Sequence, residues 1–262
     1  MKIEQRQNLI VDADDTLWEN NIYFERTFDD FCDFLAHSAL TPVEVRAVLD
    51  EIEIVNSKTH GYGTANFARN LTQCYHKLAE RDVRAEDLPR IMSFTEQILQ
   101  HPIEIISGVE ETLEYLSVRH SLTLFTKGDP EEQKLKLDRS GLGIYFGHTA
   151  IVKEKDARSY AALLRERALD PEHTWMIGNS PKSDINPALE AGIHAVFVPH
   201  ARARTLERAG PGGSSRLGLV SVSRSGSKSE PTAKSAARLE RSSSGWTDSC
   251  RPRPPRPRQW VR

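Results

Sequence analysis

The sequence predicts an α/β fold, a doubly wound parallel sheet with a small all-α domain inserted after its first strand. Apolar, strand-like runs alternate with helix-like segments from about residue 108 to residue 200. One further apolar run, residues 8–12, stands far upstream of these. Between the two parts, from Ile22 to about Gln100, apolar residues recur mostly at spacings of three and four, which is the period of amphipathic helices.

The intervening segment divides into four expected helices. The first follows Ile22, and the second opens at Thr41-Pro42, where proline suits a first helical turn. Gly61-Tyr62-Gly63 interrupts the pattern. A third helix would begin at Thr64 or Asn66, and a fourth would run from Glu86 to Leu99. Four such helices predict a small bundle over residues 19–102, with residues 1–18 and 103–200 forming the α/β core.

The core alternates in a regular order. Its expected strands are residues 122–126, 149–152, 174–178 and 195–198, and its expected helices are 110–116, 131–140, 157–168 and 186–191. Strands separated by helices favour a parallel sheet with helices on both faces.

Composition is that of a globular protein without membrane spans. Of the 262 residues, 38% are hydrophobic and 27% charged, and no apolar run approaches the roughly 20 residues that a span needs. The first seven residues lack the apolar centre of a signal peptide. Three scattered cysteines, without metal-like spacing, indicate a reducing compartment. We therefore expect a cytoplasmic protein.

The C-terminal segment, residues 201–262, differs from the rest. It carries 14 Lys and Arg against 4 Asp and Glu, a net charge of +10, which leaves −12 for residues 1–200 given the total of −2. Ser, Arg and Pro dominate it, so we expect mostly disorder. Its only plausible strand is Leu217–Val220. The segment is either a non-homologous extension, which we favour, or a functional basic tail.

Polar side chains follow four of the expected strands. They are Asp12 and Asp14, Thr126 and Lys127, Lys155, and Asn179 with Asp184. Ligands bind outside the carboxyl ends of the strands in open α/β sheets, so these groups should converge. Because two close carboxylates repel each other, a divalent cation bound by oxygen ligands would help to hold Asp12 and Asp14 together.

The stretch from Leu9 to Trp18 resembles the first motif of the haloacid dehalogenase-like (HAD) hydrolases, Asp-x-Asp-x-Thr after an apolar strand. The other three motifs follow in the same order, and the likeness covers about residues 8–200. The helical insert lies where some relatives carry a cap, between motifs one and two. This resemblance implies a Mg²⁺-dependent phosphatase that hydrolyses a small phosphorylated metabolite through an aspartyl-phosphate.

The resemblance also implies a role for each motif residue. Asp12 would be the nucleophile, and Asp14 the general acid and base. Thr126, Lys127 and Lys155 would hold the phosphate. Asp12, the backbone carbonyl of Asp14, Asp184 and Asn179 would hold Mg²⁺.

The sequence departs from the family pattern at one position and leaves a second open. Many relatives have Asp where this chain has Asn179, so Asp184 should carry most of the metal affinity. Lys153 competes with Lys155 for the third motif. We favour Lys155, because it precedes the helix that carries Tyr160, and interpret Lys153 as a surface charge.

Substrate choice would lie in the helical cap. His60, Tyr62 and Asn66 flank the break in the helical pattern and could form a loop that faces the site. A plain interhelical turn is equally compatible with these residues. The sequence names neither the substrate nor the oligomeric state.

Other functions remain open at this point. A phosphomutase of the same fold would need a phosphoenzyme protected from water. A non-catalytic phospho-acceptor module also uses acids, Thr and Lys at strand ends, although such modules lack an inserted helical bundle. A nucleic-acid binder would use the basic tail through non-specific phosphate contacts, but we favour the interpretation of that tail as a non-homologous extension.

Overall fold

The computed structural model describes residues 5–200 and 216–219 of the chain. Its sheet has six parallel strands in the order β3-β2-β1-β4-β5-β6. The strands are β1 (Asn8–Val11), β2 (Ser121–Lys127), β3 (His148–Val152), β4 (Thr174–Gly178), β5 (His194–Phe197) and β6 (Leu217–Leu219). The strand order reverses between β1 and β4, which places the expected ligand crevice at the carboxyl ends of these two strands.

Helices cover both faces of the sheet, as predicted. They are α5 (Val109–Ser117), α6 (Pro130–Ser140), α7 (Ala157–Glu166) and α8 (Asn186–Glu190). Side chains of β1 alternate between two apolar clusters: Leu9 and Val11 pack with the α5 side, and Ile10 packs with α7 and α8. The expected helix over residues 157–168 ends two residues early, because Ala168 adopts a left-handed conformation with φ 49°.

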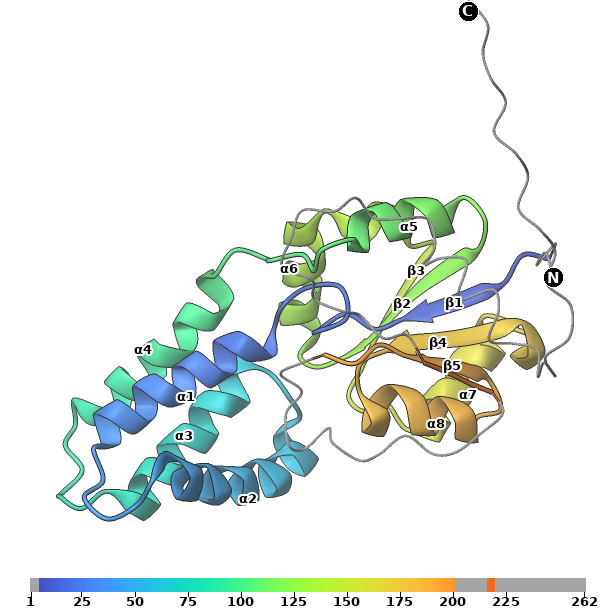
Figure 1. Cartoon of the computed structure of the whole chain (residues 1–262). Helices are drawn as coiled ribbons and strands as arrows, with labels where there is room; N and C mark the ends of the chain where they lie inside the picture. The colour runs from blue at the N-terminus through green and yellow to red at the C-terminus, as the bar shows by residue number, and fades with distance from the viewer. Residues whose placement is uncertain (1–4, 201–215, 220–262) are drawn as a thin grey trace, which may run out of the picture.

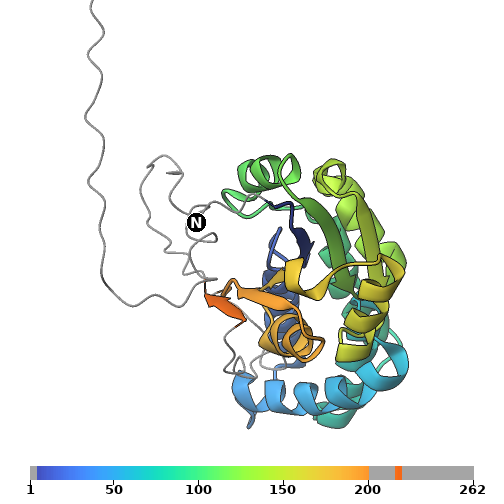
Figure 2. The same cartoon turned by 90° about the vertical axis from the view of Figure 1, so that its right-hand side faces the viewer.

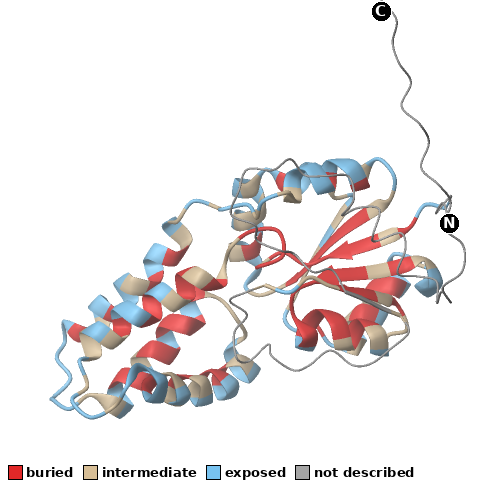
Figure 3. Cartoon of the chain, viewed as in Figure 1, coloured by how far each residue is buried: buried red, intermediate tan, exposed pale blue. Residues whose placement is uncertain are grey.

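The inserted segment forms four helices with a core of their own (Figures 1 and 3). They are α1 (Asn21–Leu35), α2 (Pro42–His60), α3 (Thr64–Leu78) and α4 (Asp87–Gln100). Phe31, Leu49 and Leu71, from three different helices, are fully buried in it. Thr41 and Glu44 form a capping box that begins α2 at the predicted residue. None of the helices in residues 5–200 is long and apolar enough to cross a membrane.

The described residues of the C-terminal segment contain one strand. Leu217–Leu219, within the only run expected to be a strand there, is β6 and pairs with β5 at the edge of the sheet (Figure 2). Residue Ala195 is level with Leu217, and Phe197 with Leu219. The expectation of disorder for the other residues of 201–262 falls outside the described part of the chain.

Candidate active site

The loop after β1 presents the two acids at the crevice. The Asp12 amide still donates to the Ile177 carbonyl at 2.9 Å, so it continues the pairing of β1 with β4. The chain then turns tightly. The Asp15 amide donates to the Trp18 carbonyl at 2.8 Å, and Asp15 itself has φ 59°. This turn sends the side chains of Asp12 and Asp14 to different partners.

Asp12 lies in a buried charge cluster with Lys155 and Asp184. The Lys155 ammonium donates to Asp12 Oδ1 and, at 2.7 Å, to Asp184 Oδ1. Burial and the Asp184 carboxylate raise the pKa of Asp12 to about 7, although Lys155 opposes them. Burial lowers the pKa of Lys155, but the two carboxylates outweigh it and hold that pKa above its usual value. Lys155 is therefore charged between two acids.

Asp184 is held in place by the turn that follows β4. Its Oδ2 accepts the Ser180 amide at 2.9 Å, and its own amide donates to the Ser180 carbonyl at 2.8 Å. Gly178, the last residue of β4, lies directly against the carboxylate. A Cβ there would overlap Asp184 Oδ2, so this close approach requires glycine.

Thr16 connects the first and fourth motifs. Its hydroxyl lies 3.1 Å from Asp12 Oδ2 and 3.3 Å from Asn179 Oδ1, and all three side chains are buried. The hydroxyl thereby orients the carboxylate and brings the Asn179 amide oxygen to the Asp12 side of the crevice.

Asp14 turns away from this cluster toward α6. The Lys136 ammonium lies 2.6 and 2.7 Å from its two oxygens, and the Gln133 amide donates to it at 2.9 Å. The Trp18 indole adds a fourth hydrogen bond at 2.8 Å. Burial alone would raise the pKa of Asp14, but Lys136 and these hydrogen bonds outweigh it, so the pKa lies below its usual value. Asp14 is ionised in this arrangement.

The second-motif residues lie at the end of β2. Thr126 is buried, and its hydroxyl is 3.3 Å from the Gln133 side-chain oxygen. The Lys127 ammonium donates to Ser183 Oγ at 2.7 Å and lies 3.7 Å from Glu154. Both residues line the same cavity as Asp12 and Asp14.

The break between α2 and α3 closes over the core. Tyr62 donates to Glu154 at 2.7 Å, its ring lies 4.4 Å from the Lys127 ammonium, and the Thr64 amide donates to Glu132. Tyr62 and Asn66 line the cavity, whereas His60 is exposed at the end of α2 and is not among the lining residues. Lys153 is also exposed, while Lys155 is buried.

These residues enclose a cavity of about 160 Å³ between the sheet and the helical cap. Core residues of all four motifs line it, together with residues of α1, α2 and α3. A cavity near this size can hold one benzene-sized molecule, so it suits a small ligand.

The oxygen donors at the carboxyl ends of β1 and β4 fit a hard divalent cation. Asp12 and Asp184 are two buried carboxylates that share one ammonium, and burial together with the Asp184 carboxylate raises the pKa of Asp12. The Asn179 amide oxygen lies on the same side through Thr16. Oxygen-only donors of this kind are those that Mg²⁺ prefers.

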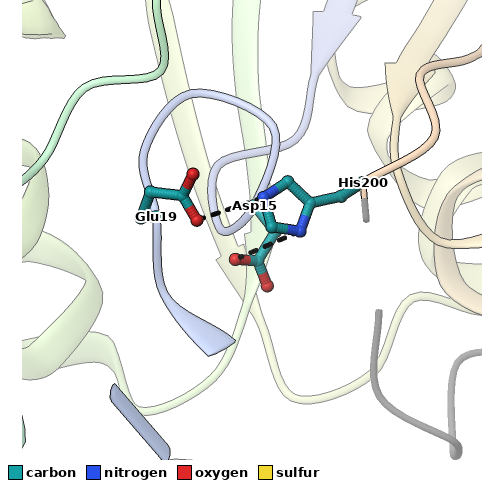
Figure 4. A group of neighbouring side chains, drawn as sticks. All are labelled: Asp15, Glu19 and His200. Carbon is teal, nitrogen blue, oxygen red and sulfur yellow. Dashed lines mark hydrogen bonds and ion pairs between the residues drawn. The ribbon is translucent and has the colours of Figure 1, made fainter. Parts of the chain in front are cut away.

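A second cluster ties the end of the sheet to the β1 loop (Figure 4). His200 Nε2 lies 3.1 Å from Glu19 Oε2, and its Nδ1 lies 4.0 Å from Asp15 Oδ1. Asp15 also accepts the Asn20 and Asn21 amides at 2.9 and 3.0 Å. One atom of each acid and of the histidine lies within 4.8 Å of the others. The two ring nitrogens face different carboxylates, so the imidazole lies between Glu19 and Asp15.

Sequence reasoning missed Lys136 and Gln133 as partners of Asp14. Their spacing of three on the helix after the second motif puts both on one face. That spacing is a signal, but it does not say which acid the face meets. The sequence also did not predict the contacts of Thr16 with Asp12 and Asn179, or the contact between Thr64 and Glu132.

Comparison with known proteins identifies the family. A family model described as haloacid dehalogenase-like hydrolase matches residues 10–198. The chain therefore belongs to the haloacid dehalogenase-like hydrolases. The crystal structure of a haloacid dehalogenase-like family hydrolase from Xanthomonas campestris is 32% identical, with a TM-score of 0.72, and the match covers 84% of this chain and 88% of that one.

Two further relatives are more distant. The putative HAD-hydrolase YfnB from Bacillus subtilis, whose structure is described as bound to magnesium, is 16% identical with a TM-score of 0.57, over 74% of this chain and 89% of that one. A phosphoserine phosphatase of Thermus thermophilus is 32% identical over 83 residues. That match covers 30% of this chain and spans about a third (33%) of the relative's length.

Proposed function

We propose that this hydrolase is a Mg²⁺-dependent phosphatase of a small phosphorylated metabolite, and that it works through an aspartyl-phosphate on Asp12. The observation that carries the proposal is the separation of two neighbouring acids. Asp12 lies beside Lys155 and Asp184 with a raised pKa, while Asp14 lies against Lys136 with a lowered one. Environments that push the pKa values of two acids apart give them different roles.

Asp12, Asp184 and Asn179 would hold the cation, together with the backbone carbonyl of Asp14. When bound, Mg²⁺ neutralises charge on the phosphate oxygens, which lets an anionic nucleophile approach. Asp184 fits this role because Ser180 and Gly178 fix its carboxylate beside Asp12. Asn179 fits it as a neutral oxygen donor.

In the first step, a carboxylate oxygen of Asp12 bonds to phosphorus while the bond from phosphorus to the ester oxygen breaks. The leaving oxygen keeps the electron pair and takes a proton from Asp14. Thr126 and Lys155 line the phosphate end of the cavity and would hold the phosphoryl oxygens, with Lys127 beside them. In the second step Asp14 removes a proton from the water that attacks phosphorus and releases Asp12.

The lowered pKa of Asp14 supports its role as the base of the second step. Lys136 holds it ionised, which suits a base. The first step needs a proton on Asp14, and a bound phosphate dianion nearby raises the pKa of a carboxyl group. Substrate binding would thus prepare the acid, and loss of the leaving group would restore the base.

Asp14 also separates this chemistry from dehalogenation. A leaving halide needs no proton, and dehalogenases of the family lack the second acid of the first motif. Three side chains make four contacts with Asp14 here: two from the Lys136 ammonium, one from the Gln133 amide and one from the Trp18 indole. A carboxylate held by this many contacts favours a reaction whose leaving group needs a proton.

The decisive experiment measures hydrolysis of para-nitrophenyl phosphate with and without Mg²⁺. We expect Mg²⁺-dependent release of inorganic phosphate, and loss of that release in Asp12→Asn. Asp138→Asn is the matched control, because Asp138 is exposed on α6. Near-normal turnover by a folded Asp12→Asn protein would remove Asp12 from the nucleophile role. With a hexose phosphate as a second substrate, conversion to a positional isomer without free phosphate would indicate a phosphomutase.

A Mg²⁺ titration tests the metal ligands separately. Changes outside the metal ligands already cost about 10–100-fold in metal affinity, so Asp184→Asn should raise the Mg²⁺ concentration for half-maximal activity by at least that factor. Asn179→Ala should raise it less, because a neutral amide contributes less to cation affinity than a carboxylate. An unchanged curve for the Asp184 variant would contradict its assignment.

A further inference from the structure

The cap side of the cavity differs from the core side in its charged groups. Residues of α1, α2 and α3 supply its polar wall: Asn21, Glu53, Ser57, Asn66 and Asn70. Among the described lining residues, the lysines are Lys127, Lys136 and Lys155, and all three belong to the core. The cap side, where the leaving group would lie, therefore presents acidic and neutral polar groups without a lysine among the described residues.

Asn66 offers an acceptor that needs a donor. Its side chain is nine-tenths buried, and its Nδ2 donates to the Gly61 carbonyl at 2.7 Å. Within the described part of the chain its Oδ1 is buried and has no hydrogen-bond partner. Buried polar atoms are usually paired, so an unpaired oxygen at a ligand cavity indicates a donor that arrives with the ligand.

Glu53 places a carboxylate on the same wall. It lies in the middle of α2 and is 5% exposed. One turn further on, Ser57 faces the cavity too, and Asn56 holds Asn70 of α3 through a 2.7 Å hydrogen bond. The wall thus presents acceptor oxygens in a fixed arrangement. Burial strengthens the attraction of such oxygens for a positive charge.

The balance of charged residues around the whole cavity also favours a positively charged leaving group. Six of the described lining residues are acids and three are lysines; the acids are Asp12, Asp14, Asp15, Glu53, Glu132 and Asp184. A phosphate dianion needs the metal and the lysines at one end. A second anionic group at the cap end would meet Glu53 and would be repelled, whereas a cation there would be attracted.

We propose that the substrate is a small phosphorylated amine, whose leaving group carries an ammonium that binds between Glu53 and Asn66 Oδ1. The proposal rests on the phosphatase activity proposed above. An ammonium brings three donors, so one can reach Asn66 Oδ1 while the positive charge meets the Glu53 carboxylate. The cavity volume of about 160 Å³ limits the leaving group to a few heavy atoms.

Two esters of equal size test the ammonium directly. Phosphoethanolamine and propyl phosphate differ only in carrying an ammonium or a methyl group at the end of the chain. Because a hydrogen bond to a charged group is among the stronger ones, kcat/KM for phosphoethanolamine should exceed that for propyl phosphate by about 10–100-fold. Phosphoglycolate, which ends in a carboxylate, should be the poorest ester. 2-Hydroxyethyl phosphate should lie between phosphoethanolamine and propyl phosphate.

The variant Glu53→Gln then tests whether Glu53 is responsible for the preference for phosphoethanolamine over propyl phosphate. The variant keeps the shape and removes the charge, so the ratio of the two kcat/KM values should fall toward one, mainly through a higher KM for phosphoethanolamine. Glu51→Gln is the matched control, because Glu51 is exposed on the same helix, and it should keep the full ratio. A full preference in Glu53→Gln would overturn the assignment of the ammonium to Glu53.

The two proposals fail in different ways. Equal kcat/KM for the two esters, with both hydrolysed, overturns the amine proposal and leaves the phosphatase intact. No hydrolysis of any ester, para-nitrophenyl phosphate included, overturns both. The comparison of esters needs only the unaltered protein, so it tests the amine proposal even if Glu53→Gln does not fold.

Discussion

The Lys136 ammonium lies 2.6 and 2.7 Å from the two carboxylate oxygens of Asp14. This pair joins α6 to the loop after β1 across 122 residues of sequence. It separates Asp14 electrostatically from Asp12, which has its own ammonium in Lys155. Two acids separated by one residue thus acquire different protonation behaviour, and two predictions follow from this difference.

The first prediction concerns the leaving group. An alkoxide is strongly basic and needs a proton as it departs, whereas nitrophenolate hardly does. Asp14→Asn should therefore reduce hydrolysis of an alkyl phosphate much more than hydrolysis of para-nitrophenyl phosphate. General acid catalysis typically contributes about 10²–10⁴-fold, which sets the expected loss on the alkyl ester.

The same variant should show a burst of nitrophenol before turnover slows, because water attack on the aspartyl-phosphate also needs a base. Steady-state and stopped-flow rates on the two esters measure both effects. Equal losses on the two esters without a burst would leave Asp14 as a structural residue of the loop.

The second prediction concerns pH. For an alkyl ester, kcat should fall as the pH rises through the pKa of Asp14 in the substrate complex, because the acid loses its proton. Lys136 lowers that pKa. In Lys136→Met burial is no longer opposed by the ammonium, so the pKa rises and the descending limb should move to higher pH. The pH dependence of kcat on an alkyl phosphate measures this shift, because kcat reports the pKa values of the enzyme–substrate complex.

Two controls distinguish a shift in the pKa of Asp14 from a general loss of activity in Lys136→Met. Lys136→Arg keeps the positive charge and should keep the limb near its original pH. With para-nitrophenyl phosphate the descending limb should lie at the same pH in Lys136→Met and in the unaltered protein, because that leaving group needs no acid. A descending limb at the same pH in Lys136→Met and in the unaltered protein would show that Asp14 does not control it.

The fold and most motif positions were predictable because they depend on local patterns. Apolar runs located β1, β2 and β4, and polar residues directly after them had to meet at one edge of the sheet. Lys155 is buried between Asp12 and Asp184, whereas Lys153 is exposed, which agrees with the preference for Lys155.

Contacts between distant elements were not predictable in this way. Whether Lys136 meets Asp14 depends on the tilt of α6 against the sheet, which no local spacing fixes. Likewise, Glu53 looks like any other charged residue of α2. Its burial depends on how α2 packs on α3 over the cavity.

The third prediction concerns Gly178. A Cβ at this position would overlap the Asp184 carboxylate, so Gly178→Ala should displace it from Asp12. We expect a rise in the Mg²⁺ requirement of about 10–100-fold, the range for changes that disturb a ligand without removing it. Gly143→Ala is the matched control, since a Cβ there meets only the Leu137 side chain at 3.8 Å. A normal Mg²⁺ curve for folded Gly178→Ala would show that Asp184 tolerates the displacement.

The last prediction concerns β6. The Ala195 amide of β5 donates to the Arg216 carbonyl at 3.0 Å, and the Arg216 guanidinium pairs with Glu172. Removing residues 206–262 deletes these contacts and leaves β5 as an unpaired edge, which invites association with other chains. Removing only residues 220–262 keeps them.

Each net hydrogen bond contributes about 1 kcal/mol, and 1 kcal/mol shifts Tm by about 2–4 °C in a chain of this size. The shorter protein should therefore melt several degrees below the longer one and aggregate sooner at the same concentration. Phosphatase activity at 25 °C should be similar in both, because the described residues lining the cavity all precede residue 200. Calorimetry and light scattering on the two truncations measure this. Equal Tm values would mean that β5 is stable as an edge strand without β6.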